Sequence, residues 1–333
     1  MTTSLSKYFF CFGRSARLGV SALKFTKPSQ VSLNSVATVG DALLHGRKVL
    51  VEFGDEGRFD ALRLLEEMLE RNAAWIFAHG DERLGDAAAA RYAGALAERA
   101  TGVPVAYIVG SAGFYGRTFA VTRDVLVPRP ETEGVVELAL AAFGDARDAP
   151  LAMCDLGTGS GIIAITLACE LPHARITALD ISPAALAVAQ RNARSHDVAV
   201  RVHFVASDMW DALAPEITFD CIVANLPYVR RSDLKGAPDA TAFEPLLALD
   251  GGDDGLDSYR ALLAQAPARL RAGGMLVMEA GPDTVPALAT LAEAAFAEPA
   301  IIEVHRDFAL HERIVVVRGS DRDPVHARNN AMP

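Results

Sequence analysis

Residues 151–168 constrain the fold of this chain more than any other stretch. They read LAMCDLGTGSGIIAITLA: an apolar run that ends at Asp155, a short loop with three glycines, and a second apolar run. The pattern predicts a buried strand, a tight turn that a ligand can approach closely, and a helix whose first N–H groups can receive a polar group. We therefore predict a cofactor cradle. Its expected contacts are Gly157, Thr158, Gly159, Ser160 and Gly161.

A second predicted strand, Ala174 to Leu179, ends in Asp180. An acidic side chain about 20 residues after such a glycine loop can bind the two hydroxyls of a ribose. Two alternatives stay open. The loop can be a tight connection that binds no ligand, and Asp180 can cap a helix that starts near Pro183. These features fit a nicotinamide enzyme as well as an S-adenosylmethionine-dependent methyltransferase.

A later strand, Ile222 to Ala224, runs into Asn225-Leu226-Pro227-Tyr228 and favours the methyltransferase. An amide or exocyclic NH2 group is a poor nucleophile, so a site that methylates it must hold both N–H bonds and steer the nitrogen. We predict that the Asn225 side-chain oxygen and a free Leu226 carbonyl each accept one of these hydrogen bonds. Pro227 would stiffen the loop, and Tyr228 would pack on the flat face of the group. The alternative is an ordinary strand-ending turn.

With these motifs the chain resembles the protein-(glutamine-N5) methyltransferases, which modify the glutamine of the Gly-Gly-Gln motif in bacterial and organellar peptide-chain release factors. The resemblance runs from about Phe59 to Arg318 and rests on several separated pieces. Besides the glycine loop and the tetrapeptide, they are Thr101 to Pro104, Tyr107 to Gly110, Phe114 to Gly116, Val125 to Glu133, Glu244-Pro245 with Ala248 to Gly252, Asp254 to Leu256, and Glu279 to Gly281.

The resemblance implies an α/β fold, a Rossmann-like class I methyltransferase with a seven-stranded, mostly parallel sheet, and a small N-terminal helical domain. It implies S-adenosyl-L-methionine as cofactor, a release factor as protein substrate, and methylation of the N5 nitrogen of glutamine. Met209 is expected beside the adenine, where the family tends to have an aromatic residue. The family usually reads Asn-Pro-Pro-Tyr, so Leu226 is a departure that bears on the rigidity of the loop.

Other functions stay open at this point. Asn-Leu-Pro-Tyr also occurs in adenine-N6 methyltransferases, whose substrate would be rRNA or DNA. A ribosomal protein can replace the release factor as the substrate of glutamine methylation. A third possibility is a binding protein that kept the fold without the activity.

The apolar pattern after residue 150 predicts a doubly wound sheet. The expected strands are Leu151–Asp155, Arg175–Asp180, Val200–Val205, Phe219–Ala224, Gly274–Glu279, Ile301–His305 and Arg313–Arg318. In related families the last two form an antiparallel pair. Ahead of the sheet, Phe114 to Val127 alternates as a β-hairpin does, with Gly116-Arg117 as its expected turn.

The chain is expected to divide into five parts. They are a basic, disordered extension (1–40), a helical substrate-recognition domain (41–112), a hairpin and linker (113–130), the methyltransferase domain (131–319) and a disordered tail (320–333). Residues 1–40 contain no Asp or Glu, which is also typical of a mitochondrial transit peptide. The Ala- and Arg-rich body favours a bacterial cytoplasmic protein.

Two segments near the predicted site carry charges. Val229 to Ser258 has no clear period and is interpreted as a substrate-facing lid. Its acidic run, Asp250 to Asp254, can meet a basic substrate or stay a solvated charge run. Arg129 and Glu131 either border the cleft or are no more than a surface ion pair plus a helix-start acid.

Composition narrows the partners. The net charge of −10 argues against a broad phosphate-binding surface and favours a protein substrate over nucleic acid. No apolar run approaches the roughly 20 residues that cross a bilayer, so no membrane contact is expected. The four cysteines and eight histidines show no metal-ligand spacing. Cys154, Cys169 and Cys221 are expected in the core.

Overall fold

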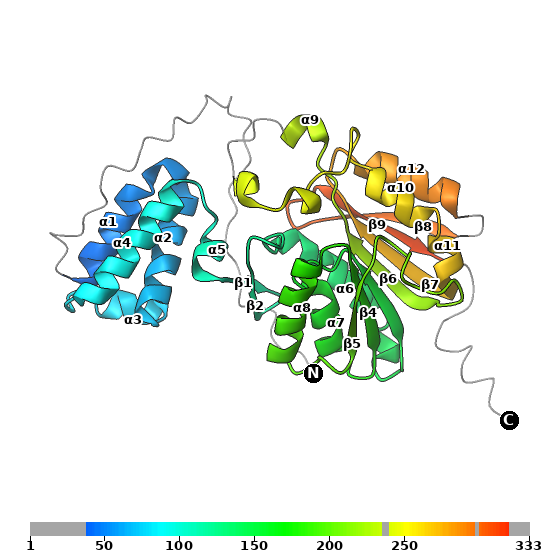
Figure 1. Ribbon diagram of the computed structural model, residues 1–333, viewed down its shortest axis with the longest axis horizontal. Coiled ribbons are helices and arrows are strands. Elements are labelled where there is room, and N and C mark those ends of the chain that lie inside the picture. The colour runs from blue at the N-terminus through cyan, green and yellow to red at the C-terminus, as the bar shows by residue number, and fades with distance from the viewer. Residues whose placement is uncertain (1–37, 235–239, 297–299, 320–333) are drawn as a thin grey trace.

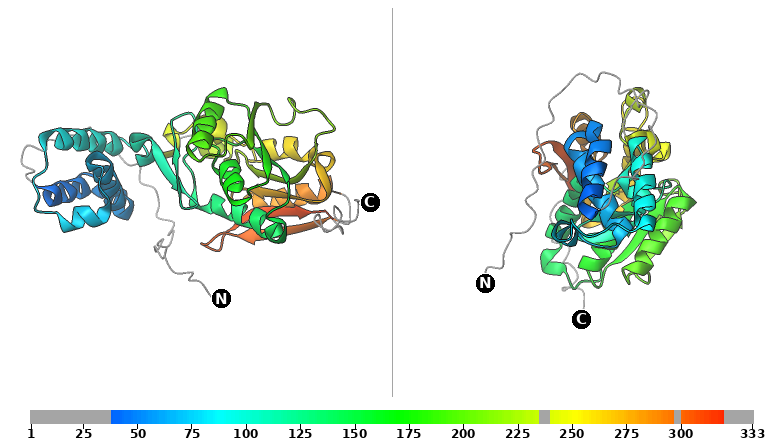
Figure 2. Two further views of the ribbon diagram at one scale, coloured as in Figure 1. Left: turned by 90° about the horizontal axis from the view of Figure 1, so that it is seen from below. Right: turned by 90° about the vertical axis from the view of Figure 1, so that its left-hand side faces the viewer.

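The computed structural model describes residues 38–234, 240–296 and 300–319. A helical bundle lies at one end of the molecule and an α/β domain at the other (Figure 1), and the left view of Figure 2 shows the same division from below. The predicted tail, 320–333, and nearly all of the predicted extension, 1–40, lie outside the described residues.

The bundle forms where the sequence predicts helices. Its elements are α1 (Val39–Val49), the 3-10 helix η1 (Val51–Phe53), α2 (Gly54–Leu69), α3 (Ala73–Ala78), α4 (Asp86–Ala100) and α5 (Val105–Val109). Apolar stripes of these helices face one another and bury Leu64, Leu65 and Tyr92. α1 begins before the predicted boundary at residue 41, because Thr38 caps it by accepting a hydrogen bond from the Asp41 N–H.

The hairpin after the bundle is displaced from its predicted position. β1 (Ser111–Phe114) pairs with β2 (Arg117–Ala120), so the predicted strand after Ala120 is wrong. The turn is Tyr115-Gly116, with φ of 50° and 69°, rather than Gly116-Arg117. A two-residue turn that matches the strand twist needs positive φ at both positions, and glycine commonly fills the second.

The α/β domain contains the predicted seven-stranded sheet, in the order β5-β4-β3-β6-β7-β9-β8. Its strands are β3 (Ala152–Leu156), β4 (Arg175–Asp180), β5 (Val202–Ala206), β6 (Phe219–Asn225), β7 (Leu270–Glu279), β8 (Ile301–Arg306) and β9 (Glu312–Arg318). β3 to β7 are parallel, and β9 is antiparallel to both β7 and β8. All seven predicted strands and the final antiparallel pair are confirmed, with small differences at their ends.

Helices cover both faces of the sheet, as the crossovers between parallel strands require (Figure 1). One face carries α6 (Glu133–Ala142), α7 (Ile162–Glu170) and α8 (Pro183–Ser195), and the other carries α10 (Asp257–Leu263), α11 (Ala266–Arg269) and α12 (Val285–Ala295). Strand β6 is therefore buried on both sides from Phe219 to Ala224. Cys154 and Cys221 lie in this core as predicted, and Cys169 is half-buried.

Short helical elements surround the carboxyl edge of the sheet. They are η2 (Pro130–Thr132) before α6, and α9 (Arg231–Leu234), η4 (Ala240–Phe243) and η5 (Leu246–Ala248) in the predicted lid. The remaining short element, η3 (Gly144–Ala146), follows α6 at the opposite edge, where β3 begins. The lid thus has only single turns among its described residues, which agrees with its lack of a sequence period.

Candidate active site

A cavity lies beyond the carboxyl ends of the central parallel strands, where ligands bind in open α/β sheets. Most residues predicted from the sequence line it: Gly157, Thr158, Gly159, Ser160, Asp180, Met209, Asn225, Leu226 and Pro227. Gly161 and Tyr228 are not in its lining. The connector from Asp124 to Arg129, Thr132, and the lid residues Pro245, Leu247 and Ala248 also line it. The cradle and the tetrapeptide therefore share one space.

The glycine loop leaves room that other residues would fill. Gly157 has φ of 73°, and a Cβ there would lie 2.8 Å from Leu226 Cδ2. Gly159 faces open space, with nothing within 4 Å of the position that a Cβ would take. The Leu226 side chain is buried against the loop. Packing thus restrains Leu226 at the position where the family has proline.

Asp155 joins the loop to the helix that follows it. Its Oδ2 accepts hydrogen bonds from Thr158 Oγ1 over 2.7 Å and from the Ala164 N–H over 3.1 Å. The carboxyl group is fully buried, and Oδ1 has no hydrogen-bond partner. Burial raises the pKa of Asp155 to about 7, although the two hydrogen bonds favour the charged form.

Asp180 lies at the carboxyl end of β4 and faces the cavity. Its two oxygens accept hydrogen bonds from the Gly159 N–H and the Ser182 N–H, both over 2.8 Å. The alternative that Asp180 caps α8 is wrong, because Ser182 is the N-cap and accepts from the Ala185 N–H. Each carboxylate oxygen has a further lone pair, so Asp180 can still accept hydrogen bonds from a ligand.

Met209 lines the cavity in a left-handed backbone conformation, with φ of 44°. Ser207 stabilises this turn, because its hydroxyl donates to the Met209 carbonyl over 2.9 Å and accepts from the Ala212 N–H over 3.0 Å. Met209, the residue expected to contact the adenine, is thus held just after the carboxyl end of β5.

Asn225 is held by a side chain that the sequence did not single out. Its Nδ2 donates to Thr132 Oγ1 over 3.0 Å. Thr132 in turn hydrogen-bonds with Glu279, which is the register partner of Asn225 across β6 and β7. Burial raises the pKa of Glu279 to about 7, and the hydrogen bond with Thr132 opposes this rise. The Asn225 side-chain oxygen is left for the cavity.

The Leu226 carbonyl is not free, contrary to the prediction. The hydroxyl of Tyr259 lies 3.2 Å from it and closer still to the Glu279 carbonyl oxygen. Tyr259 is fully buried in α10, so it supports the tetrapeptide from behind. A carbonyl oxygen has two lone pairs, and one remains for a ligand.

Tyr228 directly follows the tetrapeptide residues that line the cavity. It lies outside the cavity lining, and its ring is close to Gly281, where a Cβ would lie 3.3 Å from Tyr228 Cδ2. Burial raises the pKa of Tyr228 to about 12. Its contact with a substrate amide stays a prediction.

An ion pair between the partly exposed Arg129 and the buried Glu244 joins the connector to the lid. Arg129 Nη2 lies 2.6 Å from Glu244 Oε2, and Glu244 Oε1 accepts from the Val127 N–H over 3.0 Å. Arg129 therefore pairs with Glu244 rather than with Glu131, and it borders the cleft. Thr132, Glu244 and Glu279 all stand in stretches that carry the family resemblance. Their roles depend on partners far away in the sequence, which a local pattern does not show.

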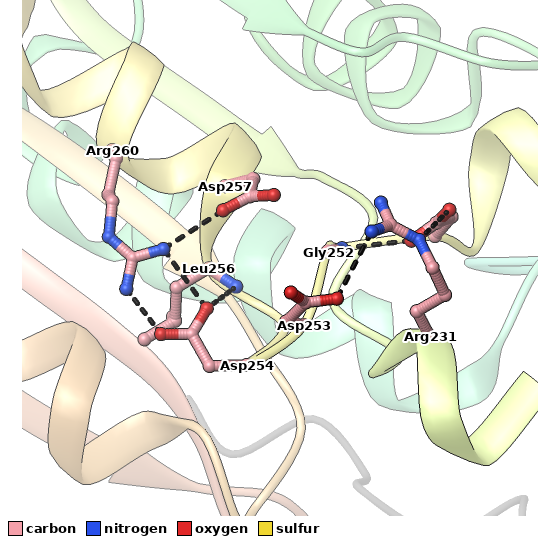
Figure 3. Close-up of polar contacts among 8 residues, drawn as sticks. Arg231, Gly252, Asp253, Asp254, Leu256, Asp257 and Arg260 are labelled. Atoms are coloured by element: carbon pink, nitrogen blue, oxygen red, sulfur yellow. Dashed lines mark hydrogen bonds and ion pairs between the residues drawn. The ribbon is translucent and has the colours of Figure 1, made fainter.

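The acidic run of the lid pairs with arginines of the same chain (Figure 3). Arg231 lies 3.1 Å from both Asp250 and Asp253, and Arg260 pairs with Asp254 and Asp257. These contacts lie at the surface, where ion pairs contribute about 0–1 kcal/mol each. The run is thus engaged within the loop rather than presented as an unpaired acidic patch.

Two further observations concern the described residues. They contain no group of three His, Cys, Asp or Glu side chains that could hold a metal ion. Within them, no helix is long and apolar enough to cross a membrane.

Comparison with known proteins assigns the family. The family described as the PrmC N-terminal domain matches residues 41–110, and the family described as the methyltransferase small domain matches residues 140–240. A release factor glutamine methyltransferase from Cereibacter sphaeroides is 48% identical over 243 residues, which cover 72% of this chain and 84% of that protein. This chain belongs to the release factor glutamine methyltransferases.

A second member of the family, from Xylella fastidiosa, is 45% identical and covers 70% of this chain and 84% of its own length. Among solved structures, a release factor-specific protein-(glutamine-N5) methyltransferase from Alicyclobacillus acidocaldarius is 25% identical, with a TM-score of 0.38. The match covers 61% of this chain and 100% of the chain from Alicyclobacillus acidocaldarius. The family and the methyltransferase fold expected from the motifs are confirmed.

Proposed function

We propose that this chain methylates the side-chain amide nitrogen of a glutamine, and that its substrate is the Gly-Gly-Gln motif of a peptide-chain release factor. The observation that carries the proposal is the shared cavity of the glycine cradle and Asn225-Leu226-Pro227. A methyl donor on the cradle and an amide at the tetrapeptide would meet there. The names of the relatives supply the substrate class.

The residues of the cradle fit S-adenosyl-L-methionine. The open space above Gly159 and the close approach of Leu226 to Gly157 leave a backbone surface that a side chain would block. In the proposal, Asp180 holds the ribose hydroxyls and Met209 lies beside the adenine, while the loop residues 157–161 surround the rest of the donor. When bound, the cofactor supplies a methyl group activated by the positive charge on sulfur.

The tetrapeptide prepares the substrate nitrogen. We propose that the Asn225 side-chain oxygen and the Leu226 carbonyl each accept one N–H bond of the glutamine amide, which fixes the direction of its nitrogen. As positive charge develops on that nitrogen, both hydrogen bonds become stronger, so they stabilise the transition state more than the ground state. No basic side chain has to remove a proton before transfer.

We propose that the helical bundle binds the protein substrate. The support is its exposed apolar side chains, with Leu44 56%, Val51 68% and Phe77 60% accessible. A release factor as substrate also implies that the enzyme works in the compartment where translation is terminated. We propose the bacterial cytoplasm, with mitochondria as the alternative that the basic N-terminal segment keeps open.

The proposal is tested by transfer of a labelled methyl group from S-adenosyl-L-methionine. Release factor, bulk ribosomal protein and rRNA are offered separately, and the labelled product is mapped by mass spectrometry. Label on the glutamine of Gly-Gly-Gln is the expected result. Label on rRNA would instead assign an adenine-N6 enzyme, and label on a ribosomal protein would change the substrate.

A further inference from the structure

We propose that Thr132 and Glu279 are positioning residues that keep the Asn225 amide in one orientation, with its oxygen toward the substrate. The proposal rests on the proposed function, because it concerns the acceptor that would receive a glutamine N–H. Thr132 is in the cavity lining beside Asn225, and Glu279 is not. Both would act through Asn225.

The need for such a device follows from the shape of an asparagine side chain. Its oxygen and its NH2 group are nearly equal in size, and a rotation of 180° exchanges them. With the oxygen toward the cavity, Asn225 accepts a hydrogen bond from an amide. With the NH2 group there, two donors would face each other and the site would repel its substrate.

The contacts around Thr132 select the first orientation. A threonine hydroxyl has one hydrogen to donate, and the hydrogen bond with Glu279 uses it when the carboxylate is charged. Only lone pairs of Thr132 Oγ1 then face Asn225. An N–H bond of Asn225 can meet them, as the 3.0 Å contact of Nδ2 does, whereas its oxygen would be repelled.

The three side chains are held by the fold itself. Thr132 and Glu279 are each 1% exposed. Asn225 and Glu279 are paired in register on neighbouring strands, and η2 presents Thr132 across them. Glu279 Oε2 is buried and has no hydrogen-bond partner among the described residues. Burial in a region of low dielectric strengthens each of these hydrogen bonds.

The first test compares three variants by kcat, KM and donor affinity on the release factor substrate. Thr132→Val removes the hydroxyl at nearly constant volume and should lower kcat on the order of tenfold, with donor affinity unchanged. Thr132→Ser keeps the hydroxyl and should restore kcat to within about threefold of the unmodified chain. Thr166→Val is the matched control, because Thr166 is fully buried in α7 and its Oγ1 has no hydrogen-bond partner. It should leave kcat unchanged.

A second test follows the charge of Glu279. The charged and titratable groups that face it are Arg313 of β9, Arg129 of the connector, Glu131 of η2, Tyr228, and Tyr259 of α10. When Glu279 takes up a proton below about pH 7, it can donate to Thr132, whose own hydrogen can then turn to the Asn225 oxygen. Therefore kcat should fall toward acid pH, and Glu279→Gln should abolish this fall.

The outcomes separate this proposal from the proposed function. If the unmodified chain methylates no release factor, the proposed function fails. If it does, and Thr132→Val keeps its kcat, or Thr132→Ser is as impaired as Thr132→Val, the orientation device is overturned. An unchanged acid limb in Glu279→Gln would overturn it as well, and this measurement decides the matter should Thr132→Val fold poorly.

Discussion

At the scale of single residues, Asn225 and Asp180 use similar oxygens for different tasks in one cavity. Asn225 has its NH2 group engaged by Thr132, so its oxygen is directed at the space beyond the strand. Asp180 has both oxygens engaged by backbone N–H groups of the loops on either side of it. The first arrangement suits a substrate amide, and the second shapes the cradle of the donor.

Replacement of Asn225 by alanine should remove an acceptor that acts on the substrate alone. We expect Asn225→Ala to lower kcat about 10²–10³-fold, the usual effect of losing one fixed hydrogen bond to a transition state. Donor affinity, measured by equilibrium dialysis with labelled S-adenosyl-L-methionine, should stay the same. Unchanged turnover would remove Asn225 from the mechanism.

Replacement of Asp180 should weaken donor binding and leave kcat at saturating donor unchanged, the opposite of what we expect for Asn225. Asp180→Ala removes the acceptor of the Gly159 N–H and of the Ser182 N–H, together with the proposed ribose contact. We expect donor affinity to fall on the order of tenfold or more, since hydrogen bonds to charged groups contribute about 1.5–3 kcal/mol. With saturating donor, kcat should recover. An unchanged donor affinity would show that the carboxylate is only structural.

At the scale of elements, the acidic loop of the lid lies directly against the tetrapeptide. A Cβ on Gly251 would lie 2.8 Å from both the Pro227 carbonyl oxygen and Tyr228 Cα. The Gly251 N–H donates to the Val229 carbonyl, which ties the two segments together. The glycines of this run therefore allow its backbone to pack directly on the backbone of the tetrapeptide. The aspartates of the run form ion pairs with Arg231 and Arg260.

Gly255 offers a test of that contact. It has φ of 82°, and a Cβ there would collide with the Tyr228 carbonyl oxygen. We expect Gly255→Ala to lower the unfolding free energy by about 1–3 kcal/mol and to reduce kcat by displacing the tetrapeptide.

Gly94 is the matched control for this substitution, because it lies inside α4 and nothing is within 4 Å of its Cβ position. Gly94→Ala should stabilise the chain by about 0.5–1 kcal/mol and leave kcat unchanged. Thermal unfolding and kcat of both variants check the prediction. Equal effects at the two positions would contradict it.

At the scale of the whole molecule, two buried carboxyl groups should make stability depend on pH. Burial raises the pKa of both Asp155 and Glu279 to about 7, so the folded chain binds more protons than the unfolded chain at mildly acid pH. Stability should therefore fall as pH rises toward 7 and level off above it. Each group changes the unfolding free energy by up to about 1.4 kcal/mol per pH unit in that range.

The measurement is the unfolding free energy from urea titrations between pH 5 and 8. Asp155→Asn keeps an oxygen for Thr158 and Ala164 but cannot ionise, so its curve should be flatter than that of the unmodified chain. A curve of unchanged slope would mean that Asp155 does not titrate in this range.

The bundle contacts the hairpin and the linker that lead to the α/β domain. Arg63 donates to Ser111 Oγ of β1 over 3.2 Å, and Arg123 of the linker lies 3.4 Å from Glu98. The Arg123–Glu98 ion pair is exposed, and exposed pairs contribute little to stability. The cradle and the tetrapeptide, by contrast, stand on a sheet that is buried on both faces, so the site depends on the α/β domain for its geometry.

Much of this protein could be predicted from its sequence. The alternation of apolar runs and turns predicted all seven strands, because buried parallel strands and their helices carry continuous apolar patterns. Glycine spacing and Asn225-Leu226-Pro227 predicted the part of the cavity lining that lies at the ends of β3 and β6, because these residues follow directly after strands whose carboxyl ends meet at one edge.

Only the tertiary structure decided how those residues are held. The hairpin turn moved by one residue because backbone twist, rather than side-chain alternation, selects its position. The Leu226 carbonyl has Tyr259 as a partner, and the Asn225 side chain has Thr132, which in turn interacts with Glu279. Such partners come from distant segments that the sheet brings together, and hydrogen bonds act only over a few ångströms. A linear pattern records neither the distance nor the direction, so these contacts could be found only in the folded chain.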